Sequence, residues 1–267
     1  MDSKTLAKSI RIHALKMANS GGGSHIGSAL SIADILAVLY NDILFVNPDN
    51  PEQADRDRFI LSKGHAGAAL YATLAELGFF PIKKLSTHYQ NGSDLSGHIS
   101  HKNVPGVEIS TGSLGHGLNI GVGMAKSAQI DNKKHKIAVL LSDGECDEGS
   151  IWEAAMFSSH HRLNNLMVVI DYNKLQSLDT VSETLALEPF KMKWESFGWQ
   201  AIELDGHNHS QLKLNFSKAG KTNKPMVFIC HTIKGKGVSF MENSVLWHYR
   251  CPKDDEFNLA MKELNKS

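Results

Sequence analysis

The sequence predicts an α/β protein in which a parallel sheet is flanked by helices. Two observations lead to this prediction. Apolar runs typical of buried strands stand at 136–141, 166–171, 199–204 and 226–231. Helical stretches separate them, near 149–162, 188–197 and 209–219. Strands that alternate with helices in this way form parallel sheets covered on both faces, and ligands bind outside the carboxyl ends of the strands.

The N-terminal half adds shorter elements. Four apolar residues recur at helical spacing and predict an amphipathic first helix: Leu6, Ile10, Ala14 and Met17. We expect a glycine-rich loop over 18–31, followed by a helix that Ser31 caps and that runs to about Tyr40. The other expected elements are a strand at 59–65, a helix at 66–78, a loop at 81–111 and a helix at 111–129.

Composition limits the function classes. The 267 residues are 42% hydrophobic and contain no evident linker, so we expect one domain over 1–267. Lys+Arg and Asp+Glu number 28 each, which argues against a nucleic-acid or membrane partner. Basic residues interrupt the N-terminal segment, which excludes a signal peptide or membrane span there. Three scattered cysteines fit a reduced cytoplasm, not a disulfide framework or zinc site, so a cytoplasmic protein is expected.

Two acidic or amide-bearing turns follow neighbouring apolar runs, "LSDGECDEG" at 141–149 and "VVIDYNKLQ" at 168–176. Asp143 and Asn173 can supply carboxylate and amide oxygens to Mg²⁺ or Ca²⁺, and the backbone carbonyl of Leu175 is a natural third ligand. Gly144 would let a diphosphate approach the backbone at a helix start. Singly, Asp143 is better explained as a helix cap and Asn173 as a turn residue. Together they favour a metal that holds a diphosphate.

The motifs resemble a known family. Asp143 and Asn173 are 30 positions apart, which resembles the thiamine diphosphate-binding signature, although Ser142 replaces its usual first glycine. Six ordered stretches over about 10–252 look like the N-terminal half of transketolase: "ANSGGGSHIGSALS", "LSKGHAG", "LSGHISH", "PGVEISTGSLGHGLNIGVGMA", "DGECDEGSIWEAAMFSSHHRLNNLMVVIDYNKLQ" and "WESFGWQAIELDGHN". The resemblance implies a thiamine diphosphate-binding domain that uses thiamine diphosphate with Mg²⁺ (or Ca²⁺).

Four histidines stand where the family places functional ones. The resemblance implies that His25 and His98 contact substrate, that His65 contacts the cofactor phosphate, and that His248 contacts both. Each alone could equally be structural. Glu148 matches a family glutamate near a dimer interface, or is an acidic residue favoured by a helix dipole. The predicted catalytic set is therefore His25, His98, His248 and Glu148.

The expected cofactor-binding residues are His65, Gly112, Ser113, Leu114, Gly144, Asn173, Ile233 and His248, and the cofactor wall among them is the "STGSLGHG" stretch. Small residues there permit a ring to approach closely, and helix packing would use them in the same way. Where the family commonly has His-Gly, this chain has His248 followed by Tyr249 and Arg250, which leaves the sugar substrates open. Lys234 and Lys236 could meet phosphate, or lie in solvent.

The resemblance covers only the first of three transketolase domains. It implies the N-terminal subunit of a split transketolase, which transfers a two-carbon ketol unit from a ketose (phosphate or related sugar) to an aldose. A C-terminal subunit with the pyrimidine-binding domain would be required, in an expected heterotetramer to which the small-residue segment 112–123 offers a contact surface. Open alternatives are a deoxysugar-phosphate synthase, a non-catalytic cofactor-binding regulator and the alpha subunit of a 2-oxo acid dehydrogenase. No G-x-G-x-x-G follows a strand, which excludes a dinucleotide-binding dehydrogenase.

Overall fold

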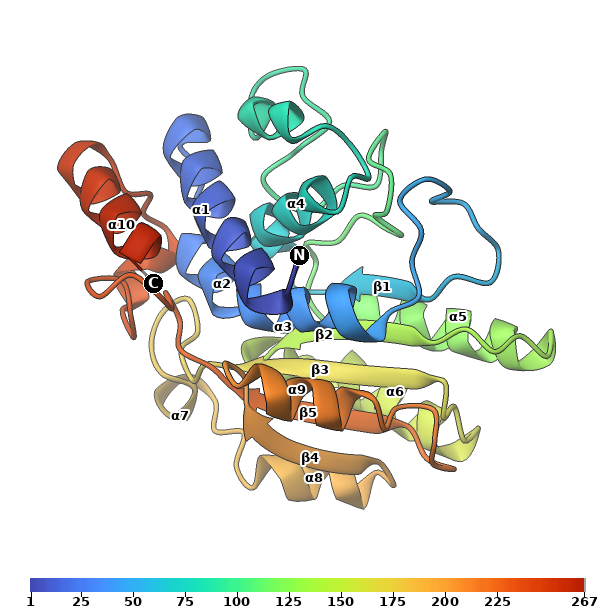
Figure 1. Cartoon of the computed structure of the whole chain (residues 1–267). Helices are drawn as coiled ribbons and strands as arrows, with labels where there is room; N and C mark the ends of the chain where they lie inside the picture. Colours follow the sequence, from blue (N-terminus) through green and yellow to red (C-terminus); the bar gives the residue numbers. More distant parts are fainter. Residues whose placement is uncertain (267) are drawn as a thin grey trace.

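Five apolar segments pair into one parallel sheet in the computed structural model, which describes residues 1–266 (Figure 1). The strands are β1 (Arg58–Leu61), β2 (Ile137–Ser142), β3 (Leu166–Tyr172), β4 (Gln200–Asp205) and β5 (Met226–His231), in the order β1-β2-β3-β5-β4. All four strand pairs are parallel. Because β2 and β3 are neighbours, the two turns that follow them lie at the same edge of the sheet.

Helices cover both faces of the sheet, as predicted (Figure 1). One face carries α2 (Ile26–Ser31), α3 (Ala33–Val38), α4 (Gly67–Glu76) and α9 (His209–Phe216), with α1 (Ser3–Gly21) and α10 (Asp254–Lys266) outside them. The other carries α5 (Gly117–Ile130), α6 (Gly149–His160) and α8 (Phe190–Ser196). Alternate side chains of each strand enter opposite cores: Val139 packs with α5 and α6, and Leu140 packs on the other side. The α/β prediction is confirmed.

The remaining elements are short. They comprise α7 (Val181–Thr184), a π-helical turn η1 (Leu39–Ile43) and the 3₁₀ segments η2 (Gly64–Ala66), η3 (Ile82–Thr87), η4 (Gly144–Asp147) and η5 (Val245–His248). The expected strand at 59–65 is shorter than predicted because η2 begins at Gly64. The expected loop at 81–111 is otherwise irregular, and the sequence reasoning did not anticipate α7 or α10.

Two predicted helix starts are wrong. Ser31 does not cap the helix that follows it: it ends α2, and α3 begins at Ala33 with Ile32 as its N-cap. The buried Ser31 hydroxyl donates to Asp171 at 2.7 Å instead of capping a helix. The helix expected from residue 111 starts at Gly117, because Gly115 has a φ of 81° and donates its amide to the Glu145 carboxylate at 2.9 Å. The preceding segment is therefore a loop fixed by a buried acid.

Glycines of α5 face the sheet of the same chain. A Cβ at Gly117 would lie 2.3 Å from the Ser62 hydroxyl oxygen, and one at Gly121 would lie 2.6 Å from Val139. Segment 112–123 was predicted to offer a surface for close contact. At Gly117 and Gly121 that contact is made with Ser62 and Val139 of the same chain. At Gly123, no atom of residues 1–266 outside the neighbouring helix backbone lies within 4 Å of the Cβ position. Neither α5 nor any other helix among residues 1–266 combines the length and apolarity needed to cross a bilayer.

Candidate active site

A cavity of about 260 Å³ lies at the carboxyl edge of β2 and β3. Most of the predicted site residues line it: His25, His65, His98, Gly112, Leu114, Asp143, Gly144, Asn173, Leu175 and His248. They come from seven separate segments of the chain, so only folding brings them together. Ser28, Gln176, Ser177, Lys234 and Tyr249, which the sequence reasoning did not select as site residues, also line it.

The four predicted histidines form one cluster. The His25 ring centre lies 5.2 Å from that of His65, 5.6 Å from that of His98 and 4.8 Å from that of His248. His25 has a left-handed backbone with a φ of 71°, and its amide donates to the His248 carbonyl at 2.7 Å. This bond ties the loop before α2 to the η5 segment. His65 Nε2 lies 2.9 Å from the Ser28 hydroxyl.

Burial keeps three of these imidazoles uncharged near neutral pH. Burial, with His98 and Lys234 nearby, lowers the pKa of His25 to about 4. Burial and Lys234 lower the pKa of His248 to about 3, and burial, with Lys63 nearby, holds the pKa of His65 well below its usual range. A neutral imidazole both donates and accepts a hydrogen bond, so this cluster can bind hydroxyl and carbonyl groups and exchange protons with them.

Asp143 sits on the buried turn after β2. Its two carboxylate oxygens accept from the Gly144 amide at 2.8 Å and the Lys174 amide at 2.7 Å. The first bond is the capping role considered from sequence, made here at the start of η4. The carboxyl is 2% exposed and forms no ion pair within the described chain. Burial and the Asp171 carboxylate raise the pKa of Asp143 to about 7. The Lys63 ammonium lowers this pKa in part, but burial and Asp171 outweigh it.

Asn173 follows β3 and faces the same cavity. Its side-chain amide donates to Asp171 at 3.0 Å, which directs the side-chain oxygen to the Leu175 amide at 3.1 Å. Asp171 is fully buried and pairs with Lys63 Nζ at 2.5 Å, with both side chains 0% exposed. Despite burial, Lys63 and hydroxyl donors hold the pKa of Asp171 below its usual range. The buried Lys63–Asp171 ion pair thus holds the Asn173 side chain in place through the hydrogen bond from Asn173 to Asp171.

Lys234 is the residue that sequence reasoning left open and the structure places in the site. It is 1% exposed, so the solvated alternative is wrong for it. Its ammonium donates to the Leu175 and Gln176 carbonyls, each at 2.8 Å, and lies 3.1 Å from His248 Nδ1. Burial and Lys63 lower its pKa to about 8. Lys236 instead lies 3.5 Å from Glu242 at the surface.

Three predicted residues do not line the cavity. Ser113 is exposed, and Ile233 donates its amide to His207 Nε2 at 2.9 Å. Glu148 is exposed at the N-cap of α6, where its side chain forms no capping bond. Glu145, which sequence reasoning passed over, is fully buried and holds the Gly115 loop. The sequence signals for such buried charges were available: Lys63 directly follows an apolar strand, and Glu145 follows another.

The residues present fit a divalent cation completed by phosphate oxygens. No group of three or more His, Cys, Asp or Glu side chains able to hold a metal occurs within residues 1–266, so a cation here would also need amide, carbonyl or phosphate oxygens. Asp143, the Asn173 oxygen and the Leu175 carbonyl offer an incomplete set of hard oxygen donors. Burial and the Asp171 carboxylate disfavour the charged form of Asp143 and so raise its pKa, and a cation bound beside Asp143 would offset that effect.

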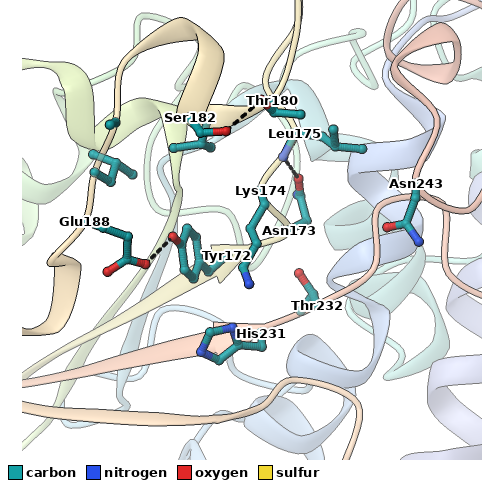
Figure 2. A pocket seen from close by; sticks show the side chains of 13 residues that line it. Tyr172, Asn173, Lys174, Leu175, Thr180, Ser182, Glu188, His231, Thr232 and Asn243 are labelled. Atoms are coloured by element: carbon teal, nitrogen blue, oxygen red, sulfur yellow. Dashed lines mark hydrogen bonds between the residues drawn. The ribbon is translucent and has the colours of Figure 1, made fainter.

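A second, larger cavity of about 590 Å³ lies beside this one (Figure 2). Asn173 and Leu175 line both cavities, so their turn lies between the two. Within the second cavity the Tyr172 hydroxyl donates to Glu188 at 2.6 Å, and the Lys174 ammonium lies 5.4 Å from the Tyr172 ring centre. All four clustered histidines line the smaller cavity and none of them lines the larger one, so the smaller cavity is the better candidate for chemistry.

Comparison with known proteins decides the family. Residues 2–265 match the family described as transketolase, thiamine diphosphate binding domain. The chain belongs to the transketolase family. It is 44% identical over 243 residues to one of the subunits of the apulose-4-phosphate transketolase of Phocaeicola vulgatus, covering 91% of this chain and 86% of that protein. It is 40% identical over 267 residues to the 6-deoxy-6-sulfo-D-fructose transketolase subunit SqwG of Clostridium sp. (strain MSTE9), covering 100% of this chain and 97% of that protein.

Solved transketolases share the fold. The Campylobacter jejuni enzyme is 30% identical with a TM-score of 0.92, and the match covers 98% of this chain and 42% of that one. The chain thus spans about two-fifths of the length of this solved transketolase. The recognition of a transketolase-type, diphosphate-binding domain from sequence is confirmed. Transketolase names on the relatives favour this family over the dehydrogenase and synthase alternatives.

Proposed function

We propose that this chain is the diphosphate-binding subunit of a heteromeric transketolase. In this role it transfers a two-carbon ketol unit from a ketose, phosphorylated or related, to an aldose. The observation that carries the proposal is that the four histidines share one cavity with Asp143, Asn173 and the Leu175 carbonyl. The membership of the transketolase family and the names of its subunit-sized relatives agree with it.

Mg²⁺ (or Ca²⁺) would be held by Asp143, the Asn173 side-chain oxygen and the Leu175 carbonyl. Lys234 orders this ligand set, because its ammonium donates to the Leu175 carbonyl and to its neighbour. Gly144 stands at the start of η4, where a Cβ would lie 3.0 Å from the Gln176 side chain. The glycine therefore lets the Gln176 side chain pack against this turn, and Gly144 lines the cavity in which we propose that the diphosphate lies.

Thiamine diphosphate, when bound, supplies the carbanion chemistry that breaks and forms the bond next to a sugar carbonyl. Gly112 and Leu114 offer the wall for its ring, and His65 lies with Ser28 where a phosphate would be held. His25 is placed at the centre of the histidine cluster, so it is the residue positioned to move protons at the substrate carbonyl and hydroxyls. His98 is exposed at the cavity, where it can bind a sugar hydroxyl.

Tyr249 and Arg250 differ in their surroundings. The Tyr249 ring lines the cavity, 5.9 Å from the His25 ring centre and 4.7 Å from that of His248. Arg250 lies 5.0 Å over the Trp247 ring and pairs with Glu256, away from the cavity. Tyr249 is therefore the substitution that narrows the substrate region, and Arg250 supports the loop. The substrates named for the relatives are a sugar phosphate and a sulfo sugar, so we propose anionic sugars as the substrate class.

The active form would require a second chain that supplies the pyrimidine-binding domain, in a heterotetramer. Relatives of similar length are named as subunits, and this chain aligns to only 42% of a solved transketolase. Glu148 lies exposed beside this edge, where a partner could meet it. The test is ketol transfer with thiamine diphosphate and Mg²⁺, by the chain alone and with its partner. Activity only in the mixture supports the proposal, and robust turnover by the chain alone refutes it.

The metal site has its own test. Asp143→Ala and Asn173→Ala are each expected to abolish Mg²⁺-dependent binding of thiamine diphosphate in calorimetric titrations with the partner present. The exposed Asp49→Ala is the matched control, because Asp49 lies on a surface loop. Unchanged cofactor affinity in Asp143→Ala or Asn173→Ala would remove that residue from the metal site.

A further inference from the structure

A cluster of charged and polar side chains around Asp34 lies outside the cavity. Arg11 from α1, His207 from the turn after β4, and His209 from α9 all contact the Asp34 carboxylate of α3. The four side chains are only 9% to 14% exposed. The cluster joins three helices to the strand-end turn, and nothing in the proposed chemistry uses it. Of its four residues, His207 lies in the "LDGHN" stretch that resembles transketolase.

His207 has a fixed protonation pattern within this cluster. Its Nε2 accepts from the Ile233 backbone amide at 2.9 Å, and its Nδ1 lies 2.7 Å from Asp34 Oδ2. A backbone amide can only donate, so Nε2 carries no proton. The ring proton is therefore on Nδ1 and donates to the carboxylate. His207 is thus a rigid bridge between α3 and the backbone of residue 233.

The bridged backbone carries Lys234 into the active site. Thr232, one residue earlier, donates its hydroxyl to Asp171. Two residues after Ile233, the Gly235 amide donates to the Gly27 carbonyl at 2.9 Å. Between these anchors, Lys234 extends to the Leu175 and Gln176 carbonyls. The path of this loop therefore sets where the ammonium group can reach.

We propose that His207 is a positioning residue that, held by Asp34, fixes the Ile233 backbone so that Lys234 reaches the Leu175–Gln176 turn. His207 lines neither the smaller cavity nor the larger one. The effect on cofactor binding rests on the proposed function, because the Leu175 carbonyl is a proposed metal ligand. The effect on the Ile233 amide and on Lys234 does not depend on that function.

His209 provides a matched comparison. It binds the same carboxylate, with Nε2 at 3.0 Å from Asp34 Oδ1, and its side chain is 12% exposed against 14% for His207. Its other ring nitrogen lies 2.8 Å from the Ser3 hydroxyl, not from the 232–235 loop. If the cluster only stabilised the fold, substitutions of His207 and His209 would have the same consequences at Lys234.

The experiment compares four variants of the full chain with the wild type. In His207→Asn the amide group replaces the Nδ1 side of the ring, so the Asp34 bond is kept and the Ile233 bond is lost. In His207→Gln the amide reaches the Nε2 side, so the Ile233 bond is kept. His209→Asn is the control, and His207→Ala, which loses both bonds, is a second loss variant should His207→Asn not fold. The readouts are hydrogen exchange at the Ile233 amide and labelling of Lys234 by an amine-reactive reagent.

We expect His207→Asn and His207→Ala to exchange the Ile233 amide about 2- to 12-fold faster, the effect of one lost hydrogen bond, and to label Lys234 faster. His207→Gln and His209→Asn should stay near the wild type in both readouts. Equal changes in the His207→Asn and His209→Asn variants, or no change in His207→Asn, would overturn the assignment. Calorimetric titration of the same variants with thiamine diphosphate, Mg²⁺ and the partner present separates the two claims. Faster exchange and labelling with unchanged cofactor affinity would uphold the positioning and refute Leu175 as a metal ligand.

Discussion

Replacing Asp143 with asparagine should stabilise the metal-free chain at alkaline pH. Burial and Asp171 raise the pKa of Asp143 from 3.8 to about 7, so the folded chain binds a proton more tightly than the unfolded chain does. Stability therefore falls as the pH rises from about 4 to about 7, and the whole penalty is present above pH 7. A difference of this size corresponds to about 4 kcal/mol of unfolding free energy. Asparagine removes the charge that causes it.

The substitution also removes a hydrogen-bond acceptor. The two oxygens of Asp143 accept from the Gly144 and Lys174 amides, and asparagine has one oxygen for the two donors. An unsatisfied buried amide costs about 1–3 kcal/mol. The expected net effect of Asp143→Asn in EDTA is a gain of about 1–3 kcal/mol at pH 8 and a loss of about 1–3 kcal/mol at pH 4.

Denaturant unfolding at pH 4 and pH 8 in EDTA measures both values, and titration with Mg²⁺ and thiamine diphosphate measures the ligand response. Wild type should be stabilised by the ligands and Asp143→Asn should not. The exposed Asp49→Asn should follow the wild type in every condition. If Asp143→Asn were less stable than the wild type at pH 8, the buried charge of Asp143 would not be destabilising as argued. If its ligand response equalled that of the wild type, Asp143 would not be a metal ligand.

Three further predictions concern the histidines, the buried ion pair and the glycine helix. His25→Ala and His98→Ala should each lower ketol-transfer turnover about 100- to 10,000-fold while calorimetric cofactor affinity changes little, and wild-type turnover in both would make these histidines structural. Lys63→Met should lower the unfolding free energy by about 3–5 kcal/mol in denaturant titrations, because it leaves the fully buried Asp171 unpaired; a loss below about 1 kcal/mol would contradict that pairing. Gly117→Ala should destabilise the protein by about 1–3 kcal/mol, because its Cβ would lie 2.3 Å from the Ser62 hydroxyl oxygen. Gly123→Ala, whose Cβ would point into open space, should stabilise the protein by about 0.5–1 kcal/mol. Equal shifts in melting temperature for the two variants would show that α5 is not packed as described.

Local signals in the sequence determined most of the fold and much of the candidate site. The strands at 137–142, 166–172, 200–205 and 226–231 were predicted to within a residue, because continuous apolar runs between helices have few alternatives in a covered parallel sheet. Asp143 and Asn173 were paired for the same reason, since parallel strands end at the same edge. The four histidines of the site were predicted from the order of their motifs along the chain, and that order requires no knowledge of the fold.

Tertiary structure alone decided the roles of buried polar groups. The local sequence predicts Ser31 to be a helix cap. In the folded protein its hydroxyl donates a hydrogen bond to the Asp171 carboxylate, 140 positions away. From its loop sequence, Lys234 could be a solvated lysine. In the folded protein it is buried, and its ammonium donates to the Leu175 carbonyl, which is distant in sequence. His207 is joined to Asp34 across 173 positions of chain. A sequence pattern indicates which residues are neighbours along one helix or strand. The partner of a buried charged or polar side chain depends instead on how separate elements pack. The reason is that burying such a group is costly unless the folded interior provides it with a hydrogen bond or an opposite charge.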